Sequence, residues 1–179
     1  MIRVVVTGSE CTGKTTLARS LASHFQTVWV PEYVRQYVEE KGSAPEYGDV
    51  ESIAHGQIAL EDSLARMAPE LLIQDCDLLS TIVYSRHYYG DCPLWIEQAL
   101  VDRHADLYLL ADIDVPWVPE GDQRDRGDRR EEMQNLFRAA LAARDLKFVE
   151  IRGSRERRLQ QAILAIESEA RCEPRGIGG

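Results

Sequence analysis

Several features of membrane, secreted and metal-binding proteins are missing from this chain of 179 residues. Its 4 cysteines are far apart, and no two have the spacing of a zinc ribbon or a redox motif, so we expect separate, reduced thiols. The 4 histidines likewise have no metal-ligand spacing. No apolar run is long enough to span a membrane, and the first apolar run is too short for a secretory signal. We therefore expect a cytoplasmic protein without a membrane partner.

The acidic net charge and the scarcity of asparagine each bear on function. Only 3 of the 21 basic residues are lysines, and 30 acidic residues give a formal net charge of −9. This balance argues against a general attraction to nucleic acid or to an anionic membrane. The single asparagine, Asn135, lies in a segment with helical periodicity. The guanine-reading motif N-K-x-D therefore has no place in this sequence, which argues against a signalling GTPase.

The length and composition are those of one globular domain. Apolar residues make up 44% and charged residues 28% of the chain. A chain of this size buries roughly 70% of the surface that its unfolded form exposes. We expect one domain over residues 1–170 and a frayed C-terminal tail over residues 171–179. The sequence does not indicate an oligomeric state.

Short apolar runs alternate with segments of helical character along the whole chain. The expected strands span residues 4–7, 27–30, 71–74, 106–110 and 148–151. The expected helices lie over residues 17–25, 33–40, 49–67, 78–88, 93–101, 133–141 and 159–166. This alternation implies right-handed crossovers and a mostly parallel sheet with helices on both faces. We therefore predict a three-layer α/β fold.

One motif carries most of the functional argument. Residues 8–15 match the phosphate-binding pattern G-x-x-x-x-G-K-[ST], between an expected strand and an expected helix. Gly8 and Gly13 allow the backbone to turn its N–H groups inward around a phosphate. Lys14 can reach the β- and γ-phosphates of ATP, and the Thr15 hydroxyl can ligate Mg²⁺. The predicted ATP-binding residues are Gly8, Ser9, Glu10, Cys11, Thr12, Gly13, Lys14, Thr15, Thr16 and, from a later loop, Arg126.

Three carboxylates follow expected strands, at the edge where open α/β sheets bind ligands. Asp75 stands in the position of a Walker B carboxylate, where it would hold Mg²⁺ through water; the alternative is a helix N-cap. Asp77 is the better cap candidate, and it could also bind substrate hydroxyls or magnesium. Glu32 could accept the proton of an attacking hydroxyl, or it could only interact with a helix dipole. Arg35, one turn later, could orient Glu32 or a phosphate.

A charged segment over residues 112–130 lacks periodicity and has the length of a functional loop. Arg124 and Arg126 could bring planar guanidinium groups to phosphate oxygens; the alternative is a solvated charged loop. Trp117 lies between two prolines and could stack on a flat ring, or it could pack against the core. Tyr33 offers a second aromatic ring for the same role.

The residue after Asp75 favours a kinase over a mechanical ATPase. ATPases of that kind usually carry a water-activating acid there, whereas this chain has Cys76. A short chain with a late arginine-rich loop is more typical of phosphate transfer to a small molecule. Three alternatives stay open: a kinase for another nucleoside or metabolite, a regulatory ATPase that moves a partner, and a binder that holds ATP without turnover.

Four segments of the chain together match a known family. They are Gly8-Ser9-Glu10-x-x-Gly13-Lys14-Thr15-Thr16-Leu17, Pro31-Glu32-Tyr33-x-Arg35-x-Tyr37-Val38, Asp75-x-Asp77, and Pro116-Trp117-Val118-x-x-Gly121-x-x-Arg124 with Gln134-Asn135. In these segments the chain resembles the kinase module of NadR-type proteins. The resemblance implies a nucleoside-kinase-like fold with five parallel strands in the order 2-3-1-4-5. It also implies phosphorylation of nicotinamide riboside by ATP to give nicotinamide mononucleotide.

The nicotinamide riboside acceptor implied by this resemblance suggests a role for each site residue. Trp117 or Tyr33 would stack on the cationic pyridinium ring, and Asp77 would bind the ribose hydroxyls. Glu32 would take the proton of the 5′-hydroxyl. Lys14, Mg²⁺ and Arg124 would stabilise the transferring phosphoryl group. The predicted catalytic residues are Lys14, Glu32, Asp75 and Arg124, the substrate residues are Glu32, Tyr33, Arg35, Asp77 and Trp117, and the magnesium residues are Thr15 and Asp75.

Overall fold

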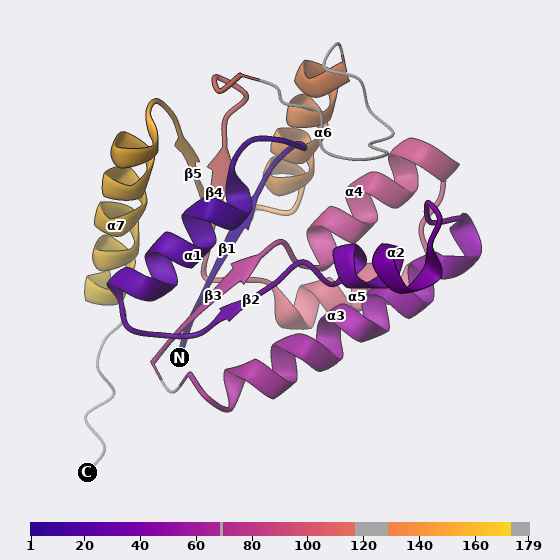
Figure 1. Cartoon of the computed structure of the whole chain (residues 1–179), viewed down its shortest axis with the longest axis horizontal. Coiled ribbons are helices and arrows are strands. Elements are labelled where there is room, and N and C mark those ends of the chain that lie inside the picture. The colour runs from indigo at the N-terminus through magenta and orange to yellow at the C-terminus, as the bar shows by residue number, and fades with distance from the viewer. Residues whose placement is uncertain (69, 117–128, 173–179) are drawn as a thin grey trace.

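The computed structural model describes residues 1–68, 70–116 and 129–172 of the chain (Figure 1). Its centre is a five-stranded sheet in the order β2-β3-β1-β4-β5. The strands are β1 (Ile2–Thr7), β2 (Trp29–Val30), β3 (Leu71–Asp75), β4 (Leu107–Ala111) and β5 (Phe148–Ile151). Every neighbouring pair is parallel. The predicted α/β class and strand order are therefore confirmed.

Helices cover both faces of this sheet (Figure 1). They are α1 (Lys14–His24), α2 (Tyr33–Lys41), α3 (Val50–Ala65), α4 (Leu78–Tyr89), α5 (Leu94–Arg103), α6 (Arg130–Ala143) and α7 (Arg155–Cys172), with a short 3-10 helix η1 (Tyr47–Asp49) before α3. α1 and α7 pack on one face of the sheet, and α3, α4, α5 and α6 pack on the other. α2 lies against α3.

Strand β1 lies in the middle of the sheet and is buried on both faces. Val4 and Val6 pack with Leu21 of α1, whereas Val5 packs with Leu79 of α4. Successive side chains of a strand point to opposite faces. A strand covered on both sides therefore reads as an unbroken apolar run, as residues 4–6 do. The apolar cores on the two faces of the sheet therefore meet at β1. The carboxyl end of this strand leads directly into the phosphate-binding loop.

The ends of β2, α3 and α7 differ from the predicted boundaries. Strand β2 is shorter than residues 27–30, because the Thr27 side chain instead donates a hydrogen bond to the carbonyl of Leu71. α3 ends at Ala65, and Met67, predicted on its apolar stripe, lies beyond the helix with 65% of its surface exposed. α7 continues to Cys172, so the predicted start of the tail at residue 171 falls inside this helix.

None of the helices in the described ranges is long and apolar enough to cross a membrane.

Candidate active site

The loop between β1 and α1 has the backbone conformation that its glycines permit. Gly8 has φ +128°, and a Cβ there would stand 2.8 Å from the carbonyl oxygen of Ala111. Gly13 has φ +80° and is the N-cap residue of α1. Cys11 also has a left-handed backbone, with φ 54°, although it carries a side chain. The loop therefore turns tightly at Gly8 and again where the helix begins.

Two side chains of the loop bind its own backbone. The Lys14 ammonium donates a hydrogen bond of 2.7 Å to the carbonyl of Ser9, and the Thr12 hydroxyl donates one of 3.0 Å to the same oxygen. Both side chains are buried. An ammonium has three protons, so Lys14 keeps two for other acceptors at the centre of the loop.

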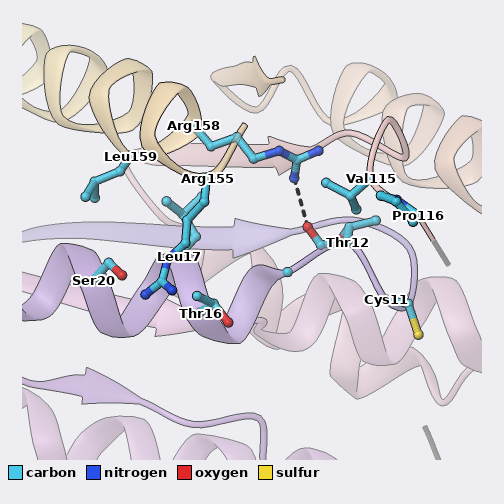
Figure 2. Close-up of a pocket in the computed structure, with 11 residues that line it drawn as sticks. Cys11, Thr12, Thr16, Leu17, Ser20, Val115, Pro116, Arg155, Arg158 and Leu159 are labelled. Atoms are coloured by element: carbon cyan, nitrogen blue, oxygen red, sulfur yellow. Dashed lines mark hydrogen bonds between the residues drawn. The ribbon is translucent and has the colours of Figure 1, made fainter. Parts of the chain in front are cut away.

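Two arginines from the far end of the chain hold the outer side of this loop. Arg158 of α7 is 5% exposed and donates to the carbonyl of Thr12 at 2.8 Å (Figure 2). Arg130 of α6 donates to the carbonyl of Cys11 at 3.3 Å and to that of Val115 at 3.0 Å. Sequence reasoning missed both residues, because charged residues in the first turn of a helix are usually solvated.

A buried glutamine joins the start of the loop to the end of β4. Gln134 of α6 is 2% exposed; its amide nitrogen donates to the carbonyl of Ala111 at 3.1 Å, and its amide oxygen accepts from the N–H of Ser9 at 3.3 Å. The signal in the sequence is a polar residue on the apolar face of a helix, next to Met133 and Phe137. Gln134 therefore positions Ser9.

Thr15 and Asp75 form a pair across the sheet edge. The Thr15 hydroxyl donates to Oδ2 of Asp75 at 2.6 Å, while Oδ1 of Asp75 is buried without a hydrogen-bond partner in the described part of the chain. Burial raises the pKa of Asp75, and the charge of Glu32 raises it further. The pKa of Asp75 is lowered by the hydrogen bond from Thr15 and by the positive charges of Lys14 and Arg35.

A hydroxyl and a carboxylate with a spare oxygen are donors of the kind that Mg²⁺ prefers, since this ion takes oxygen ligands and usually keeps several waters and substrate phosphates. Within the described ranges, no group of three or more His, Cys, Asp or Glu residues is arranged to hold a metal ion. A Mg²⁺ site built on Thr15 and Asp75 would need no such group, because this ion usually keeps waters and substrate phosphates as further ligands. The predicted Mg²⁺ residues therefore fit the ion chemically.

Glu32 and Arg35 lie beside this pair, at the carboxyl end of β2. Nε of Arg35 donates to Oε2 of Glu32 at 2.8 Å. Burial disfavours the charged form of Arg35, yet its pKa is raised overall because the charges of Glu32 and Asp75 outweigh that effect. Glu32 also raises the pKa of both Asp75 and Cys76. The structure thus brings together Glu32, Arg35 and Asp75.

Tyr84 of α4 is a neighbour that sequence reasoning missed. Its ring lies nearly parallel to that of Tyr88, with centroids 6.0 Å apart and an interplanar angle of 9°. Burial raises the pKa of Tyr84 well above its usual value, and the charges of Glu10 and Glu32 raise it further. The phenol therefore stays neutral beside carboxylates of the phosphate loop and of α2. Its apolar helical context gave no sign of this position.

Asp77 caps α4, as the sequence favoured. Its Oδ1 accepts from the N–H of Leu79 at 3.0 Å, and its Oδ2 accepts from the hydroxyl of Tyr108 at 2.7 Å. Burial raises the pKa of Asp77 to about 7, while the Tyr108 hydrogen bond opposes that shift. Both oxygens thus have partners inside the protein. A role in binding substrate hydroxyls stays a prediction.

Tyr33 begins α2 and rests on α3. Its backbone N–H donates to Oε1 of Gln57 at 2.9 Å. A Cβ at Gly56 would stand only 2.0 Å from Cε1 of the Tyr33 ring. The ring therefore lies directly over the glycine. The other predicted residues of this group, Trp117, Arg124 and Arg126, lie outside the described residues.

A cavity of about 310 Å³ opens on the other side of the phosphate loop (Figure 2). It lies between α1, the start of α7 and the segment after β4. Apolar walls come from Leu17, Pro116 and Leu159, and Thr16 and Arg155 add polar groups. The predicted ATP residues Cys11, Thr12, Gly13 and Thr16 all line it. The cavity therefore adjoins the loop that the sequence assigned to phosphates.

Comparison with known sequences places this site in a family. The sequence matches the AAA domain family over residues 3–158. It is 32% identical over 155 residues to the trifunctional NAD biosynthesis/regulator protein NadR of Escherichia coli (strain K12), an alignment that covers 83% of this chain and 37% of that protein. The NadR protein of Salmonella typhimurium is 31% identical over 156 residues, with 83% and 38% covered. The chain thus spans well under half the length of these relatives.

Solved structures share the fold. A crystal structure of NadR in complex with NR has a TM-score of 0.76 at 24% identity, and it covers 99% of this chain and 54% of that one. NadR in complex with NAD and AMP-PNP has a TM-score of 0.78 at 22% identity, with 99% and 52% covered. Thymidylate kinase from Ehrlichia chaffeensis has a TM-score of 0.68 at 15% identity, with 92% and 98% covered. The chain therefore shares the fold of these three structures.

Proposed function

The chain belongs to the AAA domain family, and on that premise we propose that it is an ATP-dependent kinase that phosphorylates the 5′-hydroxyl of nicotinamide riboside. One observation carries the proposal. The carboxylate of Glu32, held by Arg35, lies close enough to Asp75 to raise that group's pKa. A group that can accept a proton therefore lies beside Asp75, one of the residues proposed to bind magnesium. A kinase needs such a group next to its phosphate site, whereas a protein that only binds a nucleotide does not.

ATP binds with its phosphates in the loop over residues 8–15. Backbone N–H groups and the positive N-terminus of α1 bind phosphate oxygens. The two protons that Lys14 keeps beyond its bond to Ser9 reach the β- and γ-phosphates. The adjoining cavity of about 310 Å³ takes the base between Leu17 and Leu159. The arginines predicted to reach ATP or its phosphates, Arg124 and Arg126, stay part of the proposal.

Thr15 and Asp75 would hold Mg²⁺, since the hydroxyl and the unpartnered Oδ1 are both oxygen donors at one place. When bound, the ion neutralises charge that develops on the phosphates. Asp75 has a raised pKa because of its burial. A nearby cation would favour its ionised form. The ion would thus keep Asp75 ionised, and the ionised carboxylate would bind the ion.

Glu32 receives the proton of the acceptor. The 5′-oxygen forms a bond to the γ-phosphorus as the bond from that phosphorus to the bridging oxygen of ADP breaks. The proton of the 5′-hydroxyl passes to a Glu32 carboxylate oxygen. Arg35 holds the other side of this group through its bond of 2.8 Å to Oε2, which fixes the direction of the second oxygen. The products are a 5′-phosphomonoester and ADP.

Charge at the acceptor side suits a cationic ring. Glu10 and Glu32 both act electrostatically on Tyr84, whose ring is parallel to that of Tyr88. Carboxylates and aromatic faces together favour a pyridinium over a neutral base. We assign the ring contact to Trp117 or Tyr33, and ribose hydroxyls to Asp77. The NadR structure named above contains NR, which supports this choice of acceptor.

ADP release at fixed Mg·ATP across a panel of acceptors tests the proposal. The panel holds nicotinamide riboside, common ribo- and deoxynucleosides, and buffer alone, with products identified by mass. We expect the largest stimulation from nicotinamide riboside, with a product heavier by one phosphate. Stimulation by another nucleoside alone would keep the kinase and discard the pyridinium argument. Hydrolysis that no acceptor stimulates would favour a regulatory ATPase.

A further inference from the structure

The peptide bond between Glu32 and Tyr33 is held by a side chain from a different helix. The N–H of Tyr33 donates to Oε1 of Gln57 in α3 at 2.9 Å. Gln57 is 4% exposed. The first amides of a helix have no partner within the helix. An N-cap side chain usually binds the second or third of them, so the first amide, that of Tyr33, needs a partner from elsewhere. Here Glu32 is the N-cap residue, and its side chain makes no such bond.

The amide of Gln57 has only one useful orientation. Its nitrogen donates to Oε1 of Glu61 at 3.1 Å, and Glu61 is 2% exposed. Oε2 of Glu61 lies 3.3 Å from a guanidinium nitrogen of Arg103. Because a carboxylate accepts and does not donate, the NH₂ group of Gln57 faces Glu61 and its oxygen faces Tyr33. The acceptor for the Tyr33 amide is therefore fixed by a buried chain of bonds.

The neighbouring glycine holds the same residue by its side chain. A Cβ at Gly56 would stand 2.0 Å from Cε1 and 2.2 Å from Cζ of Tyr33. The ring thus packs flat on the backbone of α3, one residue before Gln57. Two consecutive residues of α3 accordingly hold both the backbone and the ring of Tyr33.

This contact bears on Glu32 because the Tyr33 amide belongs to the same peptide plane as the Glu32 carbonyl. Holding that plane fixes the rotation about the Cα–C bond of Glu32, which has ψ 108°. An N–H already bonded to Gln57 also does not compete for the Glu32 carboxylate, although helix N-termini attract carboxylates. The carboxylate is instead directed to Arg35, whose Nε lies 2.8 Å from Oε2 of Glu32.

We propose that Gln57 is a positioning residue for the reaction: by binding the Tyr33 amide, it holds the peptide plane after Glu32 and keeps the Glu32 carboxylate turned toward the acceptor hydroxyl. The inference rests on the proposed function, because it gives Glu32 the role of proton acceptor. Gln57 itself touches neither substrate nor phosphate.

The test uses Gln57→Met, which keeps the length and approximate volume of the side chain and removes both amide bonds. Gln36→Met is the matched control, since Gln36 lies on the exposed face of α2 and makes one side-chain bond, to Glu40 at 2.8 Å. Turnover, the KM for Mg·ATP and the KM for the acceptor are measured for both variants, for Glu32→Gln and for the double variant Glu32→Gln/Gln57→Met. A crystal structure of Gln57→Met shows where the Glu32 carboxylate lies.

We expect Gln57→Met to lower kcat about 10- to 100-fold, as a small misplacement of a reacting group does, with the KM for Mg·ATP unchanged. Because Gln57 acts through Glu32, the double variant should be no slower than Glu32→Gln alone. In the crystal structure, the Glu32 carboxylate should have left Arg35 for the amides at the start of α2. The Gln36→Met control should keep wild-type turnover.

Normal kcat in Gln57→Met, a double variant whose losses multiply, or an unmoved Glu32 would each overturn the inference. These results differ from failure of the proposed function, which shows as a wild-type protein that phosphorylates no acceptor. In that case the position of Glu32 in the Gln57→Met crystal structure still decides whether Gln57 directs this side chain.

Discussion

The Thr15 hydroxyl donates a hydrogen bond of 2.6 Å to Oδ2 of Asp75, which joins the first turn of α1 to the carboxyl end of β3. The residues are 60 positions apart in the chain, and β1 and β3 are paired side by side between them. The bond leaves Oδ1 of Asp75 buried without a partner among the described residues. A buried oxygen of this kind is costly for folding. We interpret that cost as a requirement of magnesium binding.

Asp75→Asn should therefore separate stability from activity. Burial raises the pKa of Asp75, so the folded state favours an uncharged side chain there. We expect the variant to melt about 2–4 °C higher at neutral pH, equivalent to ~1 kcal/mol in a domain of this size. Its kcat should fall about 100-fold or more, and its magnesium requirement should rise. Calorimetry and a magnesium titration of turnover measure both effects. A variant with normal magnesium dependence would remove Asp75 from the metal site.

Asp77 should make the stability of the protein depend on pH. Burial raises its pKa from 3.8 to about 7, so the folded protein binds more protons than the unfolded chain between these values. The stabilisation that comes from protonated Asp77 in the folded protein is fully present below about pH 4, and it is lost as the pH rises through 7. We expect Tm to fall by several degrees from pH 5 to pH 8, and to fall less in Asp77→Asn. Melting curves of both proteins across this range provide the check; parallel curves would contradict it.

Arg158→Lys should weaken ATP binding although the charge is kept. Three groups of the guanidinium donate to the carbonyls of Gly153, Thr12 and Asp112 at 2.9, 2.8 and 2.8 Å. An ammonium cannot match this planar arrangement. We expect Kd for Mg·ATP to rise about tenfold and Tm to fall. Binding of a fluorescent ATP analogue measures the first effect, and Arg157→Lys, a change at an exposed position, is the control. If Arg158→Lys bound Mg·ATP as tightly as the wild-type protein, the phosphate-binding loop would not depend on Arg158 for its conformation.

Gly56→Ala should destabilise the protein, against the usual trend. Alanine in a helix interior is normally better than glycine by about 1 kcal/mol. At this position the new methyl group would meet the Tyr33 ring at 2.0–2.5 Å. We therefore expect a lower Tm, and partial recovery in the double variant Gly56→Ala/Tyr33→Leu, which removes the flat ring. A rise in Tm for Gly56→Ala would mean that the ring does not rest on α3.

The sequence alone predicts the parts of the site that adjoin one another in the chain. The phosphate loop lies between a strand and a helix, and each of these has its own periodicity. Asp75 is recognisable because it ends an apolar run. The strand order came from the family resemblance, and the structure confirms it.

Contacts between distant segments could not be predicted in this way. Arg158 binds the carbonyl of Thr12 across 146 positions, and an arginine in a helix with this many charges reads as a solvated residue. Gln57 is a polar residue in an otherwise ordinary helix, and its partner is the backbone of Tyr33. Tyr84 lies on the same side of α4 as Tyr88, and the helix alone does not say that Glu32 is near. Each of these positions depends on how the helices pack.

Phosphorus NMR of the complete reaction tests the central claim most directly. The protein, Mg·ATP and nicotinamide riboside are incubated together, and the γ-phosphate signal is followed. We expect it to be replaced by a phosphomonoester signal that couples to the two 5′ protons of the ribose, in step with the appearance of ADP. Appearance of inorganic phosphate alone, at a rate that nicotinamide riboside does not change, would contradict the account.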